Sequence, residues 1–591
     1  MSTPWIPKRT LAEVEALLCA PGQSPGDILV LETRVIDGRV QRVYKNQWPS
    51  TRIFWLGTSQ IYADRTYLVF ENQRYTYKET FIRSLKAAAV FKDVFGVTKG
   101  DRIAICSRNY PEYIVAFWAC QLLGAVPVLA NAWLPNGPLL HCLNLTQCKL
   151  IMLDSERADR LEPELQKLAG GPKVVVLESH EGKGQWKGMQ PWQHVLESYN
   201  GDPRKVIQDD PKVAPEDDCV IFFTSGTTGL PKGVLSTQRQ FLTNPINTIV
   251  AKRRALLRRG EDIPAPTPQD PQQGVLIAVP LFHVTGLSSQ LMSSTLAGAK
   301  VALTRKWNPK EAAQLIRREK LTTTGGVPSM SVDLIESELK GYTGLEMMSH
   351  GGAAAAAVLT SRARAVFPNT MLAQGYGMTE CNSLAASIAG EDYETHPTST
   401  GLPAPVNDFL IVKDGKIMPR GELGEIWIRG PNVMKGYWRD QAATDKVVTK
   451  DGWLMSGDIG LLDEHGFLYI RDRIKDIIIR GGENIDSTTV ENALFMDGVM
   501  EVAAVAVPDE KLGELVAAVV SVQADHRAKV TEKALMALAR SRLPKFAVPV
   551  LIIFQELLPH NAAGKIIKGH LRTVARLEWE KRGRQPVVAK L

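Results

Sequence analysis

Strand-like and helix-like runs alternate along much of this 591-residue chain, and that alternation limits its fold more than any other feature. "DRIAICS" (Asp101–Ser107) has the apolar character of a buried strand, and "PEYIVAFWACQLLGA" (Pro111–Ala125) that of an apolar helix closed by a glycine. "VPVLA" and "KLIMLD" follow as further strands, and the rhythm returns at Gly274–Phe282 and Ser288–Ala299. Helices that connect successive strands favour parallel pairing. We therefore predict an α/β fold with mixed and parallel sheets.

The chain is too long for one hydrophobic core, because single cores stop growing at about 300 residues. After the charged stretch Tyr469–Ile485 come the apolar runs "EVAAVAVPD" and "ELVAAVVSVQ" and the helix-like "TEKALMALARSRL". This predicts a large N-terminal domain, residues 1–474, and a small α+β domain, residues 475–591. The basic, then proline-rich Lys252–Gln273 interrupts the α/β pattern. We expect a solvated surface insertion there, with docking to an anionic membrane as the alternative.

Composition excludes several classes of protein. The net charge of +7 is small for this length and no extended basic tract occurs, so we expect no nucleic-acid partner. Seven cysteines without a CxxC pair argue against a disulfide framework or a zinc site and favour a reducing compartment. No run of about eighteen apolar residues predicts a transmembrane helix, and the N-terminus lacks the apolar core of a signal peptide. Nothing here indicates an oligomeric state.

The C-terminus ends in Ala589, Lys590 and Leu591. This small–basic–leucine tripeptide is a conservative variant of the S-K-L peroxisomal address. We therefore expect import into peroxisomes through their import receptor, with a cytoplasmic location as the alternative.

One loop has the composition of a phosphate-binding site. It lies in "FFTSGTTGLPKGV" (Phe222–Val234), after the strand-like "CVIFF". Glycines allow backbone N–H groups to face an anion, hydroxyls add donors, and a lysine can meet a phosphate as a point charge. The spacing is not that of a P-loop nucleotidase, and a flexible surface turn is the alternative. The candidate ligand residues are Thr224, Ser225, Gly226, Thr227, Thr228, Gly229 and Lys232.

This string resembles the phosphate-binding signature of the adenylate-forming superfamily, which includes acyl-CoA synthetases, luciferases and the adenylation domains of peptide synthetases. Four further motifs of that family follow in the expected order: "QGYGMTE" (Gln374–Glu380), "SGDIG" (Ser456–Gly460), "RDRIKDIIIRGGENI" (Arg471–Ile485) and "LPHNAAGKIIK" (Leu558–Lys568). The resemblance covers about Phe54 to Arg572. It implies that a carboxylate attacks the α-phosphate of ATP, so the site must hold cations and donors around phosphorus.

The resemblance also assigns nucleotide-binding residues. Glu380 would ligate Mg²⁺, a hard cation that prefers oxygen ligands, Thr379 would donate to the α-phosphate, and Tyr376 would stack on adenine. Asp458 would accept both ribose hydroxyls. Arg473 would reach the ribose or phosphates, unless it only pairs with Asp472 or Asp476. The remaining expected ATP-binding positions are Gly351, Gly352, Ala353, Gly375 and Gly377.

In this family the small domain delivers a lysine and then rotates. Lys565 would contact the carboxylate and the α-phosphate; the family usually has Thr-Gly-Lys where this chain has Ala563-Gly564-Lys565. Lys475 occupies the hinge position. After rotation, Gly481 and Gly482 would line the tunnel for the pantetheine arm of CoA, where glycine lets a ligand approach the backbone.

The acid substrate is expected beside "PLFHVTGL" (Pro280–Leu287). By resemblance His283 lies near the carboxylate and the incoming thiol, although a core histidine is the alternative. The expected acyl pocket consists of His283, Thr285, Gly286 and Gly352. Because small residues in this region leave room for a long acyl chain, we expect a medium- or long-chain fatty acid as the substrate. The resemblance thus implies ATP, Mg²⁺, CoA and a carboxylic acid as ligands, and acyl-CoA, AMP and pyrophosphate as products.

Four other functions compete with this one. An aryl-acid or dicarboxylate CoA ligase would share the mechanism. An enzyme that passes the acyl-adenylate to a carrier protein often has an insertion near the domain joint, where "RIKDIIIRGGENI" is continuous here. A non-catalytic nucleotide-binding scaffold would not need Lys232, Glu380, Asp458, Arg473 and Lys565 together. A luciferase would need oxygen chemistry that no motif here specifies.

Overall fold

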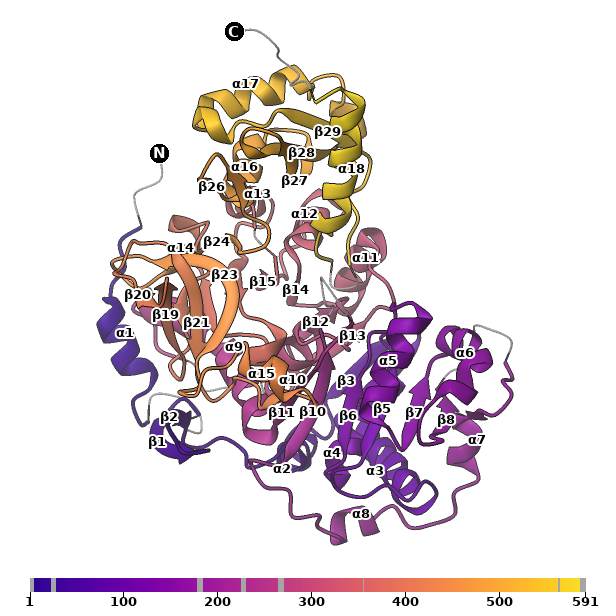
Figure 1. Cartoon of the computed structure of the whole chain (residues 1–591). Helices are drawn as coiled ribbons and strands as arrows, with labels where there is room; N and C mark the ends of the chain where they lie inside the picture. Colours follow the sequence, from indigo (N-terminus) through magenta and orange to yellow (C-terminus); the bar gives the residue numbers. More distant parts are fainter. Residues whose placement is uncertain are drawn as a thin grey trace.

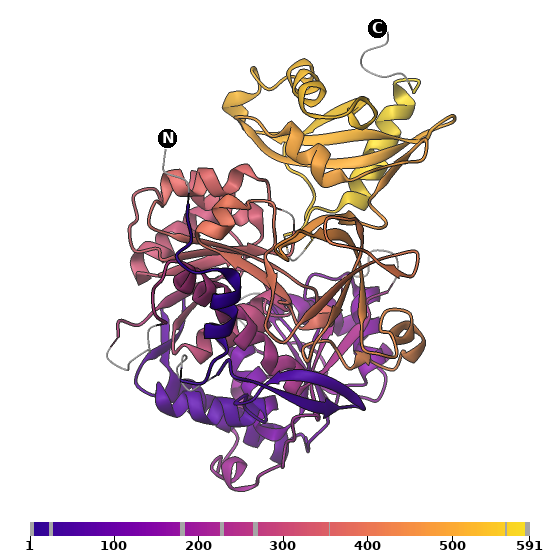
Figure 2. The same cartoon turned by 90° about the vertical axis from the view of Figure 1, so that its left-hand side faces the viewer.

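The computed structural model describes residues 5–22, 28–177, 184–224, 230–263, 270–353, 355–561 and 564–584. A small C-terminal body, yellow in Figure 1, lies on a much larger one built from the rest of the chain. Turning the molecule shows the N-terminal helix α1 (Leu11–Leu18) and the hairpin of β1 (Leu31–Ile36) and β2 (Arg39–Tyr44) on the outside of the large body (Figure 2).

The first large sheet has eight strands, and its middle is parallel. Its order is β22 (Gly436–Tyr437), β11 (Gly233–Thr237), β10 (Asp218–Phe223), β6 (Val126–Leu129), β5 (Arg102–Cys106), β7 (Leu150–Leu153), β8 (Lys173–Val176) and β9 (Gln190–Pro191). The six neighbouring strands β10, β6, β5, β7, β8 and β9 pair in parallel, whereas β11 and β22 pair antiparallel at one edge of the sheet. The central strands are buried throughout, which explains their unbroken apolar sequences.

The second large sheet has nine strands and carries most of the site. Its order is β18 (Leu402–Pro403), β17 (Ala386–Ala389), β16 (Met371–Tyr376), β15 (Met347–Gly351), β14 (Thr323–Gly326), β12 (Gly274–Ile277), β13 (Lys300–Leu303), β3 (Thr66–Phe70) and β4 (Gln73–Thr76). β16 to β3 are parallel, so the carboxyl ends of β14, β15 and β16 meet at one edge.

Helices cover and join these sheets. α4 (Pro111–Leu123) ends because Gly124 takes a left-handed conformation, φ 66°. Trp118 of α4 stacks on Trp55 of α2 (Thr51–Ile61) at 4.4 Å between ring centroids. The other large-domain helices are α3 (Tyr77–Asp93), α5 (Asn136–Thr146), α6 (Ser155–Leu161), η2 (Glu162–Lys167), α7 (Trp192–Glu197), α8 (Lys205–Gln208), α9 (Gln238–Arg258), the π-helix η3 (Thr285–Leu291), α10 (Met292–Leu296), α11 (Pro309–Glu319), α12 (Pro328–Glu336), α13 (Val358–Val366), η4 (Thr379–Cys381), α14 (Glu391–Thr395) and α15 (Gln441–Asp445).

An antiparallel sheet leads to the small domain. Its order is β20 (Lys416–Ile417), β19 (Asp408–Lys413), β21 (Gly424–Arg429), β23 (Leu454–Leu462) and β24 (Leu468–Arg473). Residues 474–477 then join β24 to β25 (Ile478–Arg480), which pairs with β28 of another sheet. The small domain contains β26 (Glu483–Ile485), β27 (Val499–Asp509), β28 (Gly513–Val522), β29 (Leu551–Gln555), α16 (Ser487–Leu494), η5 (Ala524–His526), α17 (Glu532–Arg542), η6 (Lys545–Ala547) and α18 (Lys568–Lys581).

The structure confirms the predicted α/β class with a small α+β domain. A domain boundary at residue 475 stays a prediction. Hydrogen bonds between the bodies include Gln523 Nε2 to Glu336 Oε1 at 2.8 Å, the Ala357 amide to Asn492 Oδ1 at 3.3 Å and the Ser487 amide to Asp472 Oδ2 at 2.6 Å. Within the described ranges, no helix is long and apolar enough to cross a bilayer.

The prediction of a surface insertion at Lys252–Gln273 is wrong for its first seven residues, which form the end of α9. Ala255 and Leu257 are buried there, and Arg254 is 7% exposed. The basic composition suggested a solvated segment because the acidic partners of these arginines lie far away in the sequence. Residues 264–269 of the stretch lie outside the described residues.

Candidate active site

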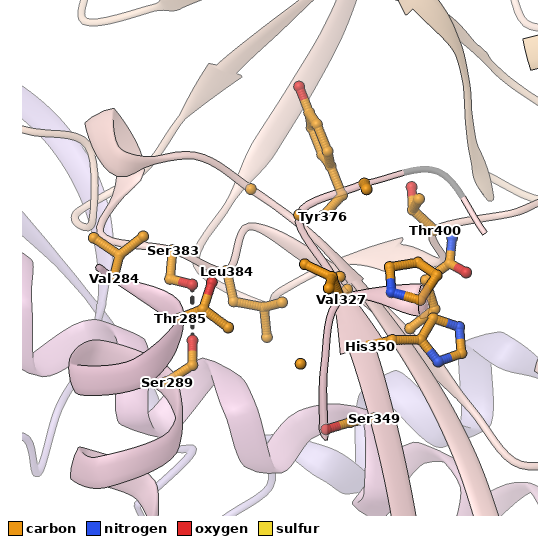
Figure 3. A pocket seen from close by; sticks show the side chains of 18 of the residues that line it. Val284, Thr285, Ser289, Val327, Ser349, His350, Tyr376, Ser383, Leu384 and Thr400 are labelled. Carbon is orange, nitrogen blue, oxygen red and sulfur yellow. Dashed lines mark hydrogen bonds between the residues drawn. The ribbon is translucent and has the colours of Figure 1, made fainter. Parts of the chain in front are cut away.

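One cavity of about 1740 Å³ brings the motifs together. The strand ends of the nine-stranded sheet, α9, η3 and the segment before α18 all contribute to its lining. In Figure 3, Ser289 and Ser383 lie together on one side of the pocket, and His350 and Thr400 lie on the other side. The Tyr376 ring extends away from the strand ends. Every predicted motif contributes at least one described residue to this cavity, from Lys232 to Lys565.

Glycines allow the strand ends to pack closely at this edge. A Cβ on Gly377 would lie 1.4 Å from the Ser383 carbonyl oxygen, and one on Gly351 would lie 2.7 Å from the Gly375 oxygen. Neither side chain could fit without moving the backbone. Gly351, Gly352, Ala353, Gly375 and Gly377 all line the cavity, and their contact with ATP stays a prediction.

Tyr376, Asp458 and Arg473 form one hydrogen-bonded group. Tyr376 Oη donates to Asp458 Oδ2 at 2.8 Å, and Arg473 Nε donates to Asp458 Oδ1 at 3.1 Å. Burial, followed by the Asp458 charge, raises the pKa of Tyr376 well above its usual value. Asp458 is 6% exposed and faces the cavity, which suits a carboxylate that accepts hydroxyl hydrogen bonds.

The alternative partners of Arg473 are engaged elsewhere. Asp472 accepts the Arg473 and Ser487 amide hydrogens at 2.8 and 2.6 Å, so it stabilises the start of α16. Asp476 pairs with Arg572 at 3.0 Å. The Arg473 side chain is therefore directed to Asp458 at the cavity.

Glu380 is held by a residue that sequence reasoning missed. Tyr437 Oη donates to Glu380 Oε1 at 2.8 Å, and Lys232 Nζ lies 4.8 Å from the centroid of the Tyr437 ring. Thr379 lines the cavity next to Glu380. The described residues contain no cluster of three metal-ligating side chains. A single carboxylate still fits Mg²⁺ that arrives with ATP, because this ion keeps waters and substrate phosphates as ligands.

The phosphate-loop candidate lies in the chain between β10 and β11. Phe223 pairs with Gly233, and the Thr224 amide donates to the Lys232 carbonyl at 3.0 Å. Thr224 and Lys232, which come before and after the undescribed residues, line the cavity. The predicted ligands Ser225, Gly226, Thr227, Thr228 and Gly229 lie outside the described residues.

Lys565 reaches the site from the small domain. A Cβ on Gly352 would lie 3.3 Å from Lys565 Cε, so the lysine stem lies directly over this glycine. Gly564, at φ 77°, packs even more closely on Val327, whose Cγ2 would lie 2.6 Å from an added Cβ. Burial and then the Arg473 charge lower the pKa of Lys565 to about 8, against the opposing effects of Asp458 and Glu380. The lysine is thus positioned among the nucleotide-binding candidates.

His283 is neutral and has a defined orientation. Its Nδ1 accepts the Thr285 amide hydrogen at 3.2 Å and lies 3.1 Å from Thr285 Oγ1. Since Nδ1 accepts, the proton of the neutral ring is on Nε2. Burial and then the Lys565 charge lower the pKa of His283 to about 3. Both His283 and Thr285 line the cavity, but Gly286 instead packs against Pro280, whose oxygen would lie 2.3 Å from an added Cβ.

The hinge and tunnel candidates lie apart from each other. Lys475 lines the cavity between the two bodies. Gly481 and Gly482, both with positive φ, form the turn between β25 and β26 and are absent from the cavity lining among the described residues.

Sequence reasoning also missed polar groups beneath the acyl pocket. Ser289 Oγ donates to Ser383 Oγ at 2.8 Å (Figure 3), and Asn244 Nδ2 donates to Ser289 Oγ at 3.3 Å. His350 Nε2 bonds Tyr393 Oη at 2.7 Å. Ser289 lies six residues beyond His283 in the motif region, which is the one signal that could have indicated it.

Comparisons with known proteins identify the family of this chain. Residues 58–438 match the model of the AMP-binding enzyme family, and residues 489–565 match that of the AMP-binding enzyme C-terminal domain. The chain is 31% identical to a long-chain-fatty-acid–CoA ligase of Escherichia coli over 87% of this chain and 92% of that one. It is 32% identical to a feruloyl-CoA synthase of an Amycolatopsis species over 81% and 89%.

A solved structure has the same fold. The o-succinylbenzoate CoA synthetase of Bacillus subtilis, in complex with its acyl-adenylate intermediate, aligns at a TM-score of 0.73 and 27% identity, over 89% of this chain and 98% of that one. The same synthetase has also been solved in complex with ATP and a magnesium ion.

Proposed function

This chain belongs to the AMP-binding enzyme family as an AMP-forming acid–CoA ligase, and from that premise we propose that it activates a medium- or long-chain acid and transfers it to CoA. The observation that supports this most directly is the place of Lys565. It lies over Gly352 in the cavity that Asp458 and Glu380 line. A cation from a separate domain thus lies among groups suited to ribose and phosphates.

The first half-reaction forms the acyl-adenylate. A carboxylate oxygen bonds to the α-phosphorus of ATP as the α–β phosphoanhydride bond breaks, and pyrophosphate leaves. Asp458 binds the ribose hydroxyls, and charged Lys565 stabilises the negative charge that builds up on the carboxylate and α-phosphate oxygens. His283 Nε2–H is free to donate to a carboxylate oxygen and orient it. Mg²⁺, held by Glu380 and phosphates, would offset phosphate charge when bound.

The second half-reaction needs a different arrangement. The CoA thiol loses its proton to solvent, its sulfur bonds to the acyl carbon, the bond from that carbon to the AMP oxygen breaks, and AMP leaves. Gly481 and Gly482 lie away from the cavity while Lys565 occupies it. We assign the change to rotation about Lys475, which would withdraw Lys565 and bring these glycines to the pantetheine arm.

The length of the acid is inferred from the pocket. Thr285 and Ser289 are small, and the cavity extends from them along α9 as far as Leu256. Aryl acids are the competing substrate class, because one relative is named a feruloyl-CoA synthase. The tail Ala589–Leu591 lies outside the described residues; peroxisomal import is proposed from its sequence alone, and a fluorescent fusion ending in it that stays diffuse would refute import.

A panel of acids tests the function. AMP release is measured with and without CoA for saturated acids, cinnamate-type acids and dicarboxylates. CoA-dependent acyl-CoA from octanoate through palmitate supports the proposal, whereas turnover confined to aryl acids refutes the substrate class. Acyl transfer only to a carrier protein would refute the acceptor.

The variant Lys565→Ala tests the mechanism. Acid-dependent ATP–pyrophosphate exchange should collapse, while thioester formation from preformed acyl-adenylate should largely survive. If both half-reactions survive, Lys565 does not have the assigned role.

A further inference from the structure

Four arginines lie near the end of α9, and three of them have carboxylate partners. The pairs are Arg254 with Glu15 at 2.5 Å, Arg258 with Asp392 at 2.9 Å, and Arg259 with Glu391 at 2.9 Å. They attach α9 to α1 and to α14. These three arginines therefore have a structural role that accounts for them.

Arg253 differs from the other three. It lines the acyl cavity, and among the described residues its guanidinium makes no hydrogen bond and no ion pair. Its Nη1 atom is buried without a partner. Burial lowers the pKa of Arg253 to about 10, and the only charge effect opposing this comes from the Tyr44 phenol. A guanidinium is a strong donor that remains protonated at neutral pH, so this side chain stays charged beside the cavity.

Arg253 is partly buried, and its buried Nη1 has no partner; a charge withdrawn from water in this way is costly unless it is paired. Carboxylates were available to the three neighbouring arginines but not to Arg253. The missing partner of Arg253 is then an anion that enters the cavity. A carboxylate suits the planar guanidinium best, because both groups can form two parallel hydrogen bonds.

The position of Arg253 indicates which part of a substrate it would meet. Asn244, on the same helix, bonds Ser289 below His283 and Thr285. Arg253 follows nine residues later, about 13 Å further along the helix axis and on the other side of the helix from Asn244. Thr248, Ile249 and Leu256 line the cavity along the same helix. An extended acid with its reacting carboxylate at His283 would therefore direct its far end toward Arg253.

We propose that the substrate acid carries a second carboxylate at its far end and that Arg253 binds it at the distal end of the acyl cavity. This inference rests on the proposed ligase function and narrows its substrate class to ω-carboxy acids. An unsubstituted chain would instead place its methyl end against an unpaired guanidinium. Arg253 is thus a specificity-determining residue far from the reacting atoms.

The test compares acids that differ only at the far end. With the full-length enzyme, kcat/KM for acyl-CoA formation is measured for octanedioate, dodecanedioate and hexadecanedioate and for the monocarboxylates of the same lengths. The wild type should prefer the dicarboxylate at one or more lengths. Arg253→Met should lower kcat/KM for that dicarboxylate at least a hundredfold and change the matching monocarboxylate by less than threefold, and Arg253→Lys should lie between.

Arg259→Met is the matched control, because it removes an arginine of the same run that pairs with Glu391. It should leave the ratio of dicarboxylate to monocarboxylate activity unchanged. Binding of dodecanedioate and dodecanoate to the wild type, by calorimetry, gives a second measurement that needs no variant; tighter binding of the dicarboxylate supports the proposal.

Two results would overturn this inference while leaving the ligase function intact. One is a wild type that prefers monocarboxylates at every length. The other is a loss in Arg253→Met that is equal for both acids. If no acid of either kind releases AMP in the presence of CoA, the proposed medium- or long-chain substrate class itself fails.

Discussion

The lowered pKa of Lys565 predicts a specific pH dependence for acyl-adenylate formation. Only the charged lysine can stabilise negative charge at the α-phosphate. With a pKa of about 8, about 90% of the lysine is charged at pH 7 and about 10% at pH 9. Because the pKa is lowered, the active form is lost as pH rises. The kcat/KM for this half-reaction should fall about tenfold between pH 7 and pH 9.

His283 cannot mask this effect, since its pKa of about 3 keeps it neutral throughout that range. The assay is single-turnover formation of acyl-adenylate at subsaturating ATP and acid, without CoA. Lys565→Arg is the internal control. It shares every substrate ionisation but keeps its charge, so its profile should be flat over the same range, at a lower absolute rate. A wild-type profile as flat as that of Lys565→Arg would refute the reasoning.

Three further changes test other parts of the site. Asp458→Asn removes a charged acceptor worth about 1.5–3 kcal/mol, so the KM for ATP should rise about tenfold to a hundredfold with little change for the acid; an unchanged KM contradicts the ribose assignment. Gly377→Ala places a Cβ 1.4 Å from the Ser383 oxygen, so it should destabilise the protein by about 1–3 kcal/mol in denaturant unfolding, and wild-type stability would contradict the packing. Thr285→Tyr should narrow the pocket and reduce palmitate activity more than octanoate activity in steady-state assays; equal losses would show that the acyl chain of the substrate does not pass Thr285.

Local sequence was sufficient for much of the fold. The runs at β5, β6 and β7 are apolar because these strands are buried on both faces. The glycine that closes α4 adopts the left-handed conformation that ends a helix. Signals of this kind depend on neighbouring residues, so they are readable without the tertiary structure.

The residues of the candidate site were predictable where a short sequence motif contains the functional side chain itself. Asp458, Glu380 and Lys565 were all identified from short strings, and all line the cavity. Tyr437 was not identified, because it meets Glu380 across 57 positions of the chain. A tyrosine in a short segment gives no local sign of such a partner.

The sequence by itself determined the element types, the order of the motifs and the residue types available for phosphate, ribose and acid. Only the tertiary structure decided which of these side chains meet. Arg253 and Arg254 are adjacent and chemically identical, yet helix phase directs Arg254 to Glu15 and leaves Arg253 at the cavity. The reason is physical: successive residues of a helix point about 100° apart, and the surrounding elements that supply or withhold a partner come from distant parts of the chain.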